Sequence, residues 1–263
     1  MKIPNFKTEA GSNQYKDTVG RLIAPRVAEV LLENIGSHLE NPLCKTILDL
    51  GCGPGTLTFQ IANNFPQMKL TGVDSSESMI TLAKSAVDKQ GLKNVQFNQM
   101  EADHISFDPA TFDLVLCNLA FPFFPKPHES MRGIFSVVRP GGTVHFTVPG
   151  RQTWNEFFEV ASSVAGNMVS MARPFLSKFS QSEVLPEALS AAGFINITEK
   201  RVLLPFEFAN GQSVLEFFAG LFSLMNHAPI HLKSELSAAI DRSYQEGFTM
   251  HYEAVIYSAD RSK

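Results

Sequence analysis

The chain has 263 residues, of which 44% are hydrophobic and 18% are charged, and its formal net charge at pH 7 is -4. These proportions are those of a globular protein, and they exclude an intrinsically disordered or fibrous chain. The 22 lysine and arginine residues are outnumbered by 26 acidic residues and form no basic stripe, so we expect no nucleic acid partner.

The first part of the chain alternates helical and strand patterns. Apolar residues at helical spacing over 15–39 predict two short helices with a break near Pro25. Beyond them the patterns predict strands at 46–50, 69–73, 95–99, 112–117 and 143–148, and helices at 58–64, 76–90 and 127–138. Strands that alternate with helices predict an α/β fold with a parallel sheet and right-handed crossovers.

The second part of the chain departs from this alternation. Its patterns predict helices at 154–171, 181–192, 211–225 and 231–246, and strands at 195–203 and 251–258. No linker or low-complexity tract separates it from the first part, so we predict one domain over 1–263.

A glycine-rich loop follows the first predicted strand, in the segment ILDLGCGPG at 47–55. Its glycines, Gly51, Gly53 and Gly55, allow a tight turn and let a ligand approach the backbone closely. The dinucleotide-binding spacing Gly-x-Gly-x-x-Gly is not met, because its sixth position is Thr56. The loop therefore favours a nucleoside cofactor without a pyrophosphate.

An acidic residue, Asp74, ends the second predicted strand about 20 residues beyond the loop. A carboxylate at this place can accept two hydrogen bonds from ribose hydroxyls. The same residue could instead be the N-cap of the helix that begins near Ser76, and the two roles are compatible.

The motifs, taken in this order, resemble those of the class I S-adenosylmethionine-dependent methyltransferases. The segment 49–55 is similar to motif I of that family, and 101–104, 112–119 and 137–142 are similar to its later motifs. The resemblance implies a Rossmann-like, mostly parallel seven-stranded sheet with helices on both faces and a helical cap over the active site. It also implies S-adenosyl-L-methionine as the cofactor.

The resemblance implies a set of cofactor contacts. In proteins similar to this one, an Asp at the place of Asp103 receives the adenine amino group, and an apolar residue at the place of Met79 often lies against the adenine face. Met79 is as readily a core residue, and the hydroxyl of Tyr15 could reach the cofactor carboxylate or serve only in packing. The implied contacts are Tyr15, Asp49, Gly51, Cys52, Gly53, Asp74, Ser75, Met79, Ala102, Asp103, His104, Asn118 and Leu119.

The domain then divides by expected role into N-terminal helices (1–40), a cofactor-binding half (41–150) and an acceptor-binding half with helical lid insertions (151–263). Methyl transfer from a sulfonium is an in-line displacement, which needs orientation and exclusion of water more than a dedicated catalytic residue. A base would help with a hydroxyl or an acidic carbon, and His104, His128 and His145 are candidates. Each of these histidines could instead have a structural or cofactor-contacting role, so no catalytic residue is assigned.

The acceptor is expected to be a small, partly apolar molecule. The tail of the fourth strand, at 118–121, lacks the two prolines typical of enzymes that methylate base amino groups. The whole chain resembles the branch that contains biotin-pathway malonyl-carrier and quinone-type methyltransferases. The acceptor pocket is expected among the phenylalanines of the second half, which are Phe157, Phe158, Phe206, Phe208, Phe217, Phe218 and Phe222.

Three other functions stay open from the sequence. A protein of the same fold could bind the cofactor and catalyse a cyclisation or rearrangement without methyl transfer. A nicotinamide oxidoreductase is weakened by Thr56, and a noncatalytic scaffold would have no evident need for Asp49, Asp74 and Asp103 at strand ends.

The remaining expectations concern metals, membranes and location. Cys44, Cys52 and Cys117 have neither paired spacing nor neighbouring histidines, so neither a disulfide nor a metal site is expected. No run approaches the roughly 20 apolar residues of a membrane span, and residues 1–20 lack the apolar core of a signal peptide. We therefore expect no membrane partner and a cytoplasmic location, while the oligomeric state is not predicted.

Overall fold

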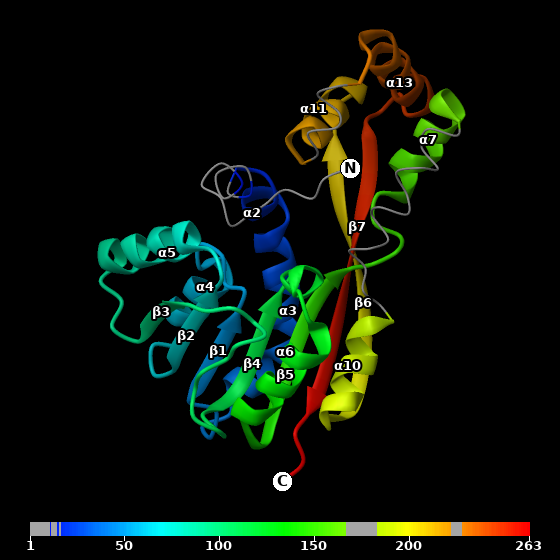
Figure 1. Ribbon diagram of the computed structural model, residues 1–263. Coiled ribbons are helices and arrows are strands. Elements are labelled where there is room, and N and C mark those ends of the chain that lie inside the picture. The colour runs from blue at the N-terminus through cyan, green and yellow to red at the C-terminus, as the bar shows by residue number, and fades with distance from the viewer. Residues whose placement is uncertain (1–10, 12–14, 16, 167–182, 222–227) are drawn as a thin grey trace.

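The structure is a computed structural model of residues 1–263, and it describes residues 11, 15, 17–166, 183–221 and 228–263. Its centre is a seven-stranded sheet in the order β3-β2-β1-β4-β5-β7-β6 (Figure 1). Strands β1 to β5 run parallel, and β7 pairs antiparallel with both β5 and β6. The strands are β1 (Thr46–Leu50), β2 (Lys69–Asp74), β3 (Val95–Gln99), β4 (Phe112–Asn118), β5 (Val138–Pro149), β6 (Ile195–Phe208) and β7 (Phe248–Asp260).

Helices cover both faces of this sheet. The described helices are α2 (Val19–Leu22), α3 (Ala24–Leu39), α4 (Thr56–Asn64), α5 (Glu77–Gln90), η1 (Phe121–Phe123), α6 (Pro127–Val137), α7 (Asn155–Ala165), α10 (Val184–Ala192), α11 (Gly211–Leu221) and α13 (Ile230–Ser243). Leu31 of α3 and Ile61 of α4 pack on one face, in the same cluster as Ile47. Ile134 of α6 and Leu189 of α10 pack on the other face. The predicted Rossmann-like, mostly parallel seven-stranded sheet is confirmed.

Three of the helices in the described ranges form a cap beyond the rest of the sheet. Strands β6 and β7 extend past their neighbours, and α7, α11 and α13 gather at the far end of this ribbon (Figure 1). The cap has its own buried cluster around Trp154, and Leu119 and Ala24 from the sheet domain belong to the same cluster. The cap core is therefore continuous with the carboxyl end of β4 and the start of α3.

The structure corrects several predicted boundaries. The fifth strand was expected at 143–148, after a helix ending at Val138, but β5 already begins at Val138. Phe112 pairs with Val138 and Leu114 with Thr143, so the extra residues bulge out of the ladder. Gly141, at φ 78°, permits this bulge, and its N–H donates to the carbonyl of Arg261.

The last two strands are also longer than predicted. Strand β6 was expected to end at Leu203, yet it continues to Phe208 through Pro205. A proline is tolerated there because β6 lies at the sheet edge, where one side of the strand needs no hydrogen-bond donor.

The N-terminal helices also differ from the prediction. The break between α2 and α3 falls at Ile23, and Pro25 lies at the start of α3. Helix α3 has 16 residues, so it is not short as predicted. The predicted helical segments at 167–171, 181–182 and 222–225 lie outside the described residues.

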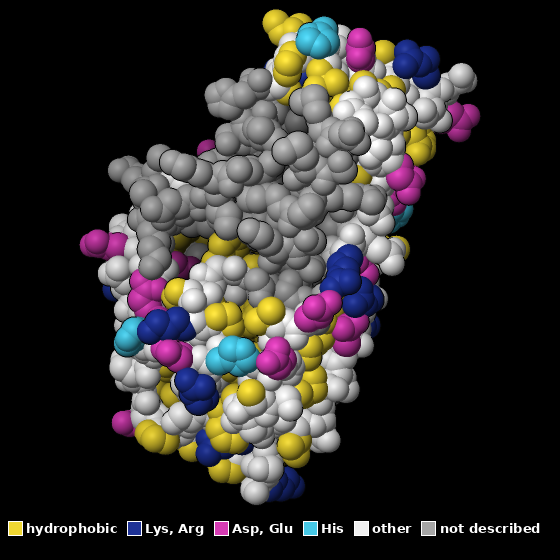
Figure 2. All heavy atoms as spheres, turned by 45° about the vertical axis from the view of Figure 1, so that its right-hand side comes forward, with side chains coloured by type: hydrophobic (Ala, Val, Ile, Leu, Met, Phe, Trp, Pro, Cys, Tyr) yellow, Lys and Arg dark blue, Asp and Glu magenta, His cyan; other side chains and the backbone are white. Residues whose placement is uncertain are grey.

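The surface carries charges of both signs. On the face seen in Figure 2, the lysine and arginine side chains are mixed with aspartate and glutamate rather than gathered in one patch. None of the helices in the described ranges has the length and apolar character needed to cross a membrane.

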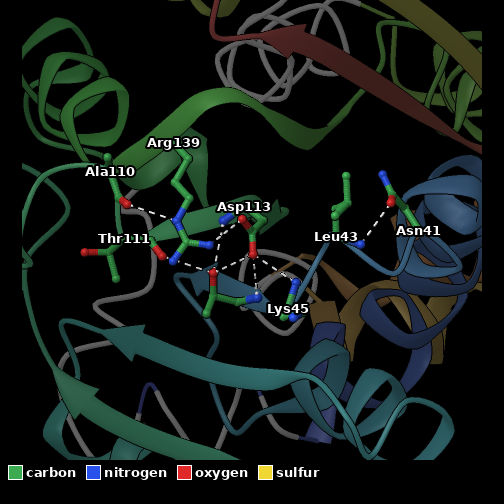
Figure 3. Close-up of polar contacts among 8 residues, drawn as sticks. Asn41, Leu43, Lys45, Ala110, Thr111, Asp113 and Arg139 are labelled. Carbon is green, nitrogen blue, oxygen red and sulfur yellow. Dashed lines mark hydrogen bonds and ion pairs between the residues drawn. The ribbon is translucent and has the colours of Figure 1, made fainter. Parts of the chain in front are cut away.

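A polar network fastens the amino ends of β1 and β4 (Figure 3). One oxygen of Asp113 accepts hydrogen bonds from the backbone N–H groups of Lys45 and Thr46 at 2.9 Å each. Its other oxygen accepts from Arg139 at 2.6 Å, and Arg139 also donates to the carbonyl of Ala110. Burial acts to raise the pKa of Asp113, but these hydrogen bonds outweigh it and lower the pKa. The network lies at the edge opposite the glycine loop, so Arg139 has a structural role.

Candidate functional site

The loop after β1 folds back onto the end of β2. The backbone N–H groups of Gly51 and Cys52 donate to the carbonyl of Val73 at 2.8 and 3.0 Å. The N–H of Gly53 donates to the Asp74 carboxylate at 2.9 Å. These bonds hold the loop at the carboxyl edge of the sheet, where parallel α/β sheets bind their ligands.

The three loop glycines have different reasons to be glycine. All three have positive φ, at 69° for Gly51, 54° for Gly53 and 94° for Gly55. A Cβ at Gly51 would lie 2.2 Å from the Cβ of Ala120, and one at Gly55 would lie 2.6 Å from the ring of Phe59. At Gly53 the nearest atom would be 3.7 Å away, on Tyr15. Close packing therefore explains Gly51 and Gly55, whereas at Gly53 only the positive φ favours glycine, because a Cβ there would meet no clash.

A buried carboxylate, Asp49, lies directly before the loop. Its side chain is 1% exposed and accepts a hydrogen bond from the Thr58 hydroxyl at 2.5 Å. Burial raises the pKa of Asp49 to about 6; the Thr58 hydrogen bond opposes this rise, and the charge of Asp74 adds to it. A cation bound nearby would stabilise the charged form of Asp49.

Tyr15 lies beside the same loop. Burial raises the pKa of its phenol, and the charges of Asp74 and Asp49 raise it further, as does Cys52. The Tyr15 ring lies 3.7 Å from the position that a Cβ of Gly53 would occupy, and the raised pKa keeps its phenol protonated at neutral pH. The structure thus brings Tyr15 together with motif I, from which it is more than 30 residues distant in sequence.

The first turn of α5 continues the site. The second oxygen of Asp74 accepts from the backbone N–H of Ser76 at 2.8 Å, and the Ser76 hydroxyl accepts from the N–H of Met79 at 3.4 Å. Ser76 is therefore the N-cap, which corrects the alternative that gave this role to Asp74. Ser75 is half-buried and Met79 is buried, as a core residue would be.

Asp103 follows β3 and lies within a small charged group. Its carboxylate is 3.0 Å from Nδ1 of His104 and 3.9 Å from Nζ of Lys126. Burial acts to raise the pKa of Asp103, but the hydrogen bond with His104 and the charge of Lys126 outweigh it and lower the pKa. Ala102 beside it is buried. Lys126 was missed from the sequence because it follows Asp103 by more than 20 residues and belongs to no motif.

Asn118 and Leu119 join the sheet to the cap. The Asn118 amide donates to the carbonyl of Ala24 at 3.1 Å and accepts from the Thr147 hydroxyl at 2.7 Å. These bonds give Asn118 a structural role between β4, β5 and α3. Leu119 adopts φ 61°, an uncommon conformation for a residue with a side chain, and it is buried in the cap cluster.

None of the three candidate bases is both buried and close to the glycine loop. His104 is 74% exposed and His128 is exposed. His145 is buried, and its Nδ1 is 2.7 Å from the Ser258 hydroxyl. Burial and the neighbouring His38 lower the pKa of His145 to about 3, so it is neutral at physiological pH. No three potential metal ligands of the His, Cys, Asp and Glu types come together within the described ranges.

The phenylalanines expected to line an acceptor pocket gather in the cap. Phe157 and Phe218 are buried with ring centroids 4.0 Å apart. The ring of Trp154 lies edge-on to Phe206 and Phe217, at 5.1 and 5.3 Å. Of the remaining expected residues, Phe158 and Phe208 belong to the same cluster, and Phe222 lies outside the described residues. Sequence reasoning missed the central position of Trp154 in this aromatic cluster.

Comparison with known proteins now identifies the family. Residues 44–203 match the sequence model of a family described as a methyltransferase domain. The chain belongs to this family. The resemblance to class I S-adenosylmethionine-dependent methyltransferases, predicted from the motifs, is thereby confirmed.

Curated relatives of this methyltransferase-domain protein act on several acceptors. The malonyl-[acyl-carrier protein] O-methyltransferase of Bacillus anthracis is 29% identical over 161 residues, which cover 59% of this chain and 58% of that relative. The demethylmenaquinone methyltransferase of Lactococcus lactis is 29% identical over 167 residues, which cover 58% of this chain and 66% of that relative. The chain thus spans less than two thirds of the length of these relatives.

Solved structures share the fold. Haemonchus contortus phosphoethanolamine N-methyltransferase 2, in complex with phosphomonomethylethanolamine and S-adenosylhomocysteine, aligns with a TM-score of 0.63 at 18% identity. That alignment covers 98% of this methyltransferase-domain chain and 58% of the other. The [4+2]-cyclase SpnF aligns with a TM-score of 0.55 at 17% identity, and it covers 91% of this chain and 82% of the cyclase. At these identities the likeness is one of fold.

Proposed function

We propose that the chain is an S-adenosyl-L-methionine-dependent methyltransferase that transfers a methyl group to a small, partly apolar acceptor by in-line displacement. The observation that carries this proposal is the glycine loop at the carboxyl edge of the sheet, which directly follows the buried Asp49 and whose Gly53 N–H is held by the Asp74 carboxylate. S-adenosylmethionine has two positive charges, a ribose diol and an adenine amino group, so it needs carboxylates spaced along one sheet edge. Family membership supports the same activity.

The residues at the edge fit the donor in chemical type. Asp74 has the carboxylate oxygens that ribose hydroxyls require, and Asp103, in the turn after β3, offers a further acceptor for the adenine amino group. Asp49, whose pKa of about 6 leaves it mostly ionised at neutral pH, complements a positively charged donor. Bound S-adenosylmethionine would supply an activated methyl group, and the chain would orient it and exclude water.

The acceptor side of the proposal rests on the cap. Leu119 follows β4 and is buried in one cluster with Trp154 and Phe218, so an apolar acceptor would meet the donor where this cluster adjoins the glycine loop. The mixed charges on the face seen in Figure 2 also favour a small molecule over nucleic acid. The cytoplasmic location and the single-domain organisation stay predictions.

Binding and product formation test this function separately. Isothermal titration with S-adenosylmethionine, S-adenosylhomocysteine and NAD should give binding of the first two only, and preferential NAD binding would contradict the proposal. Labelled donor incubated with candidate acceptors should release S-adenosylhomocysteine in step with a methylated product. Product without that release would establish the cyclisation or rearrangement function instead.

A further inference from the structure

The hydroxyl of Thr58 is bonded to the buried carboxylate that precedes the glycine loop. It donates to one oxygen of Asp49 at 2.5 Å, and neither of the two residues is more than 1% exposed. Asp49 lies near the end of β1 and Thr58 in the first turn of α4, so the bond closes the glycine loop at its base. Because both groups are buried, solvent competes little for this hydrogen bond.

Helix α4 begins without a side-chain cap. Its N-cap is Gly55, which has no side chain to accept from the free backbone N–H groups of the first turn. The carboxylate of Asp49 lies at this end of the helix, where it accepts from the backbone of Thr58 as well as from its hydroxyl. The positive end of the helix dipole also favours a negative charge there. The start of α4 therefore stabilises the charged form of Asp49.

The titratable groups around Asp49 do not stabilise its charge. The charge of Asp74, at the end of β2, raises the pKa of Asp49. Burial and, to a lesser degree, the charge of Asp49 raise the pKa values of Tyr15, of Cys52 in the loop and of Cys117 on β4, so these three groups are uncharged at neutral pH. The hydrogen bonds from α4 are therefore what opposes the effects of burial and of Asp74.

We propose that Thr58 is a positioning residue for donor binding, because its hydroxyl holds the Asp49 carboxylate in place and in the charged form that attracts S-adenosylmethionine. This inference rests on the proposed function and adds a residue that acts on the donor through Asp49. The pKa of about 6 at Asp49 already includes the effect of the hydroxyl. Loss of one hydrogen bond to a charged group should raise this pKa to about 7 to 8, so a large share of Asp49 would be neutral at pH 7.

Isothermal titration with S-adenosylmethionine between about pH 5 and pH 8.5 tests this role. The proteins are the wild type, Thr58→Val, which replaces the hydroxyl with a methyl group of similar size, and Thr58→Ser, which keeps the hydroxyl. The matched control is Thr71→Val, because Thr71 is a buried threonine of β2 whose hydroxyl accepts from Gln96 at 2.9 Å. Circular dichroism checks that each variant is folded, and Thr58→Ala replaces Thr58→Val if the latter is not.

Wild-type affinity should fall as pH drops through about 6, because the donor prefers the charged form of Asp49. In Thr58→Val the midpoint of this fall should lie about 1 to 2 pH units higher. Its affinity should then be about two- to tenfold below that of the wild type at pH 7 and within about twofold of it at pH 8.5. Thr58→Ser and Thr71→Val should keep the wild-type midpoint.

Four results would overturn the inference. They are an unchanged midpoint in Thr58→Val, equal weakening of its binding at every pH, the same upward shift in Thr58→Ser or Thr71→Val, and wild-type affinity that does not vary with pH. A wild type that binds no S-adenosylmethionine at any pH would instead refute the proposed function.

Discussion

The carboxylate of Asp74 accepts a hydrogen bond from the backbone N–H of Gly53 at 2.9 Å, and the residue that ends β2 thereby shapes the loop after β1. Its other oxygen accepts from Ser76 at the start of α5. One side chain therefore organises both the loop and the helix that would surround a bound nucleoside.

Asp74→Ala should lower the affinity for S-adenosylhomocysteine by about 100-fold, because two charge-assisted hydrogen bonds to the ribose are each worth roughly 1.5 kcal/mol or more. Isothermal titration measures this loss. Asp108→Ala is the matched control, since Asp108 is an exposed aspartate on the loop before β4. Equal affinities of Asp74→Ala and the wild type would contradict the site assignment.

Alanine substitutions at Gly51 and Gly53 should separate packing from ligand binding. Gly51→Ala places a Cβ 2.2 Å from Ala120 and should destabilise the fold by about 3 kcal/mol or more. Gly53→Ala meets no such clash and should cost only about 1 kcal/mol for its left-handed backbone. It should still weaken donor binding roughly tenfold, since the methyl group fills the space beside the backbone.

Chemical unfolding and calorimetry on both glycine variants check this pair of expectations. A Gly53→Ala protein that binds S-adenosylhomocysteine as tightly as the wild type would show that the donor does not approach this part of the loop.

Because Asp49 is buried, replacing it with a neutral residue should stabilise the fold, and the size of this gain should depend on pH. The folded-state pKa of about 6 lies above the value of about 4 expected in the unfolded chain. The charged side chain therefore destabilises the fold fully above pH 6, and this cost disappears as pH falls toward 4. Asp49→Asn, which can still accept from Thr58, should stabilise the protein by up to about 3 kcal/mol at pH 8 and by less at pH 5. Denaturant unfolding at both pH values measures the gain, and an equal gain at both would rule out this cause.

The network of Figure 3 should matter for stability and not for donor binding. Asp113→Ala leaves the N–H groups of Lys45 and Thr46 and the side chain of Arg139 without their acceptor, and it should cost about 2 to 3 kcal/mol. The lowered pKa of Asp113 means that its contribution is present above about pH 4 and is lost as pH falls further. S-adenosylhomocysteine affinity measured well below the melting temperature should be unchanged. A large loss of S-adenosylhomocysteine affinity would contradict this expectation, because it would mean that a change at the amino end of β1 alters the donor site at its carboxyl end.

Much of the sheet and of the donor site could be predicted because both depend on local patterns. The strand at 46–50 and its glycine loop appear as a short apolar run followed by glycines, and the strand at 95–99 has the same bounds in the structure. Asp74 was expected at the site because it ends a strand next to the loop. Parallel strands bring such ends together without further information from the sequence.

The missed features depend on contacts between distant residues. Lys126, the residue before α6, approaches Asp103 in the loop that follows β3. The structural role of Asn118 could not be predicted, because its amide donates to the carbonyl of Ala24, some 90 residues earlier in the chain. Pro205 could be accepted into β6 only once that strand was known to lie at the sheet edge.

Strand β7 contributes to three separate buried clusters. Tyr252 and Ala254 belong to the cap cluster, Val255 and Tyr257 to the cluster under α6 and α10, and Ile256 to the cluster under α3. Every other described element precedes β7 in the chain, so a growing polypeptide exposes all three apolar surfaces until this strand is made. Cooperative folding must then wait for β7, and any fragment that ends before Phe248 should aggregate or be held by chaperones.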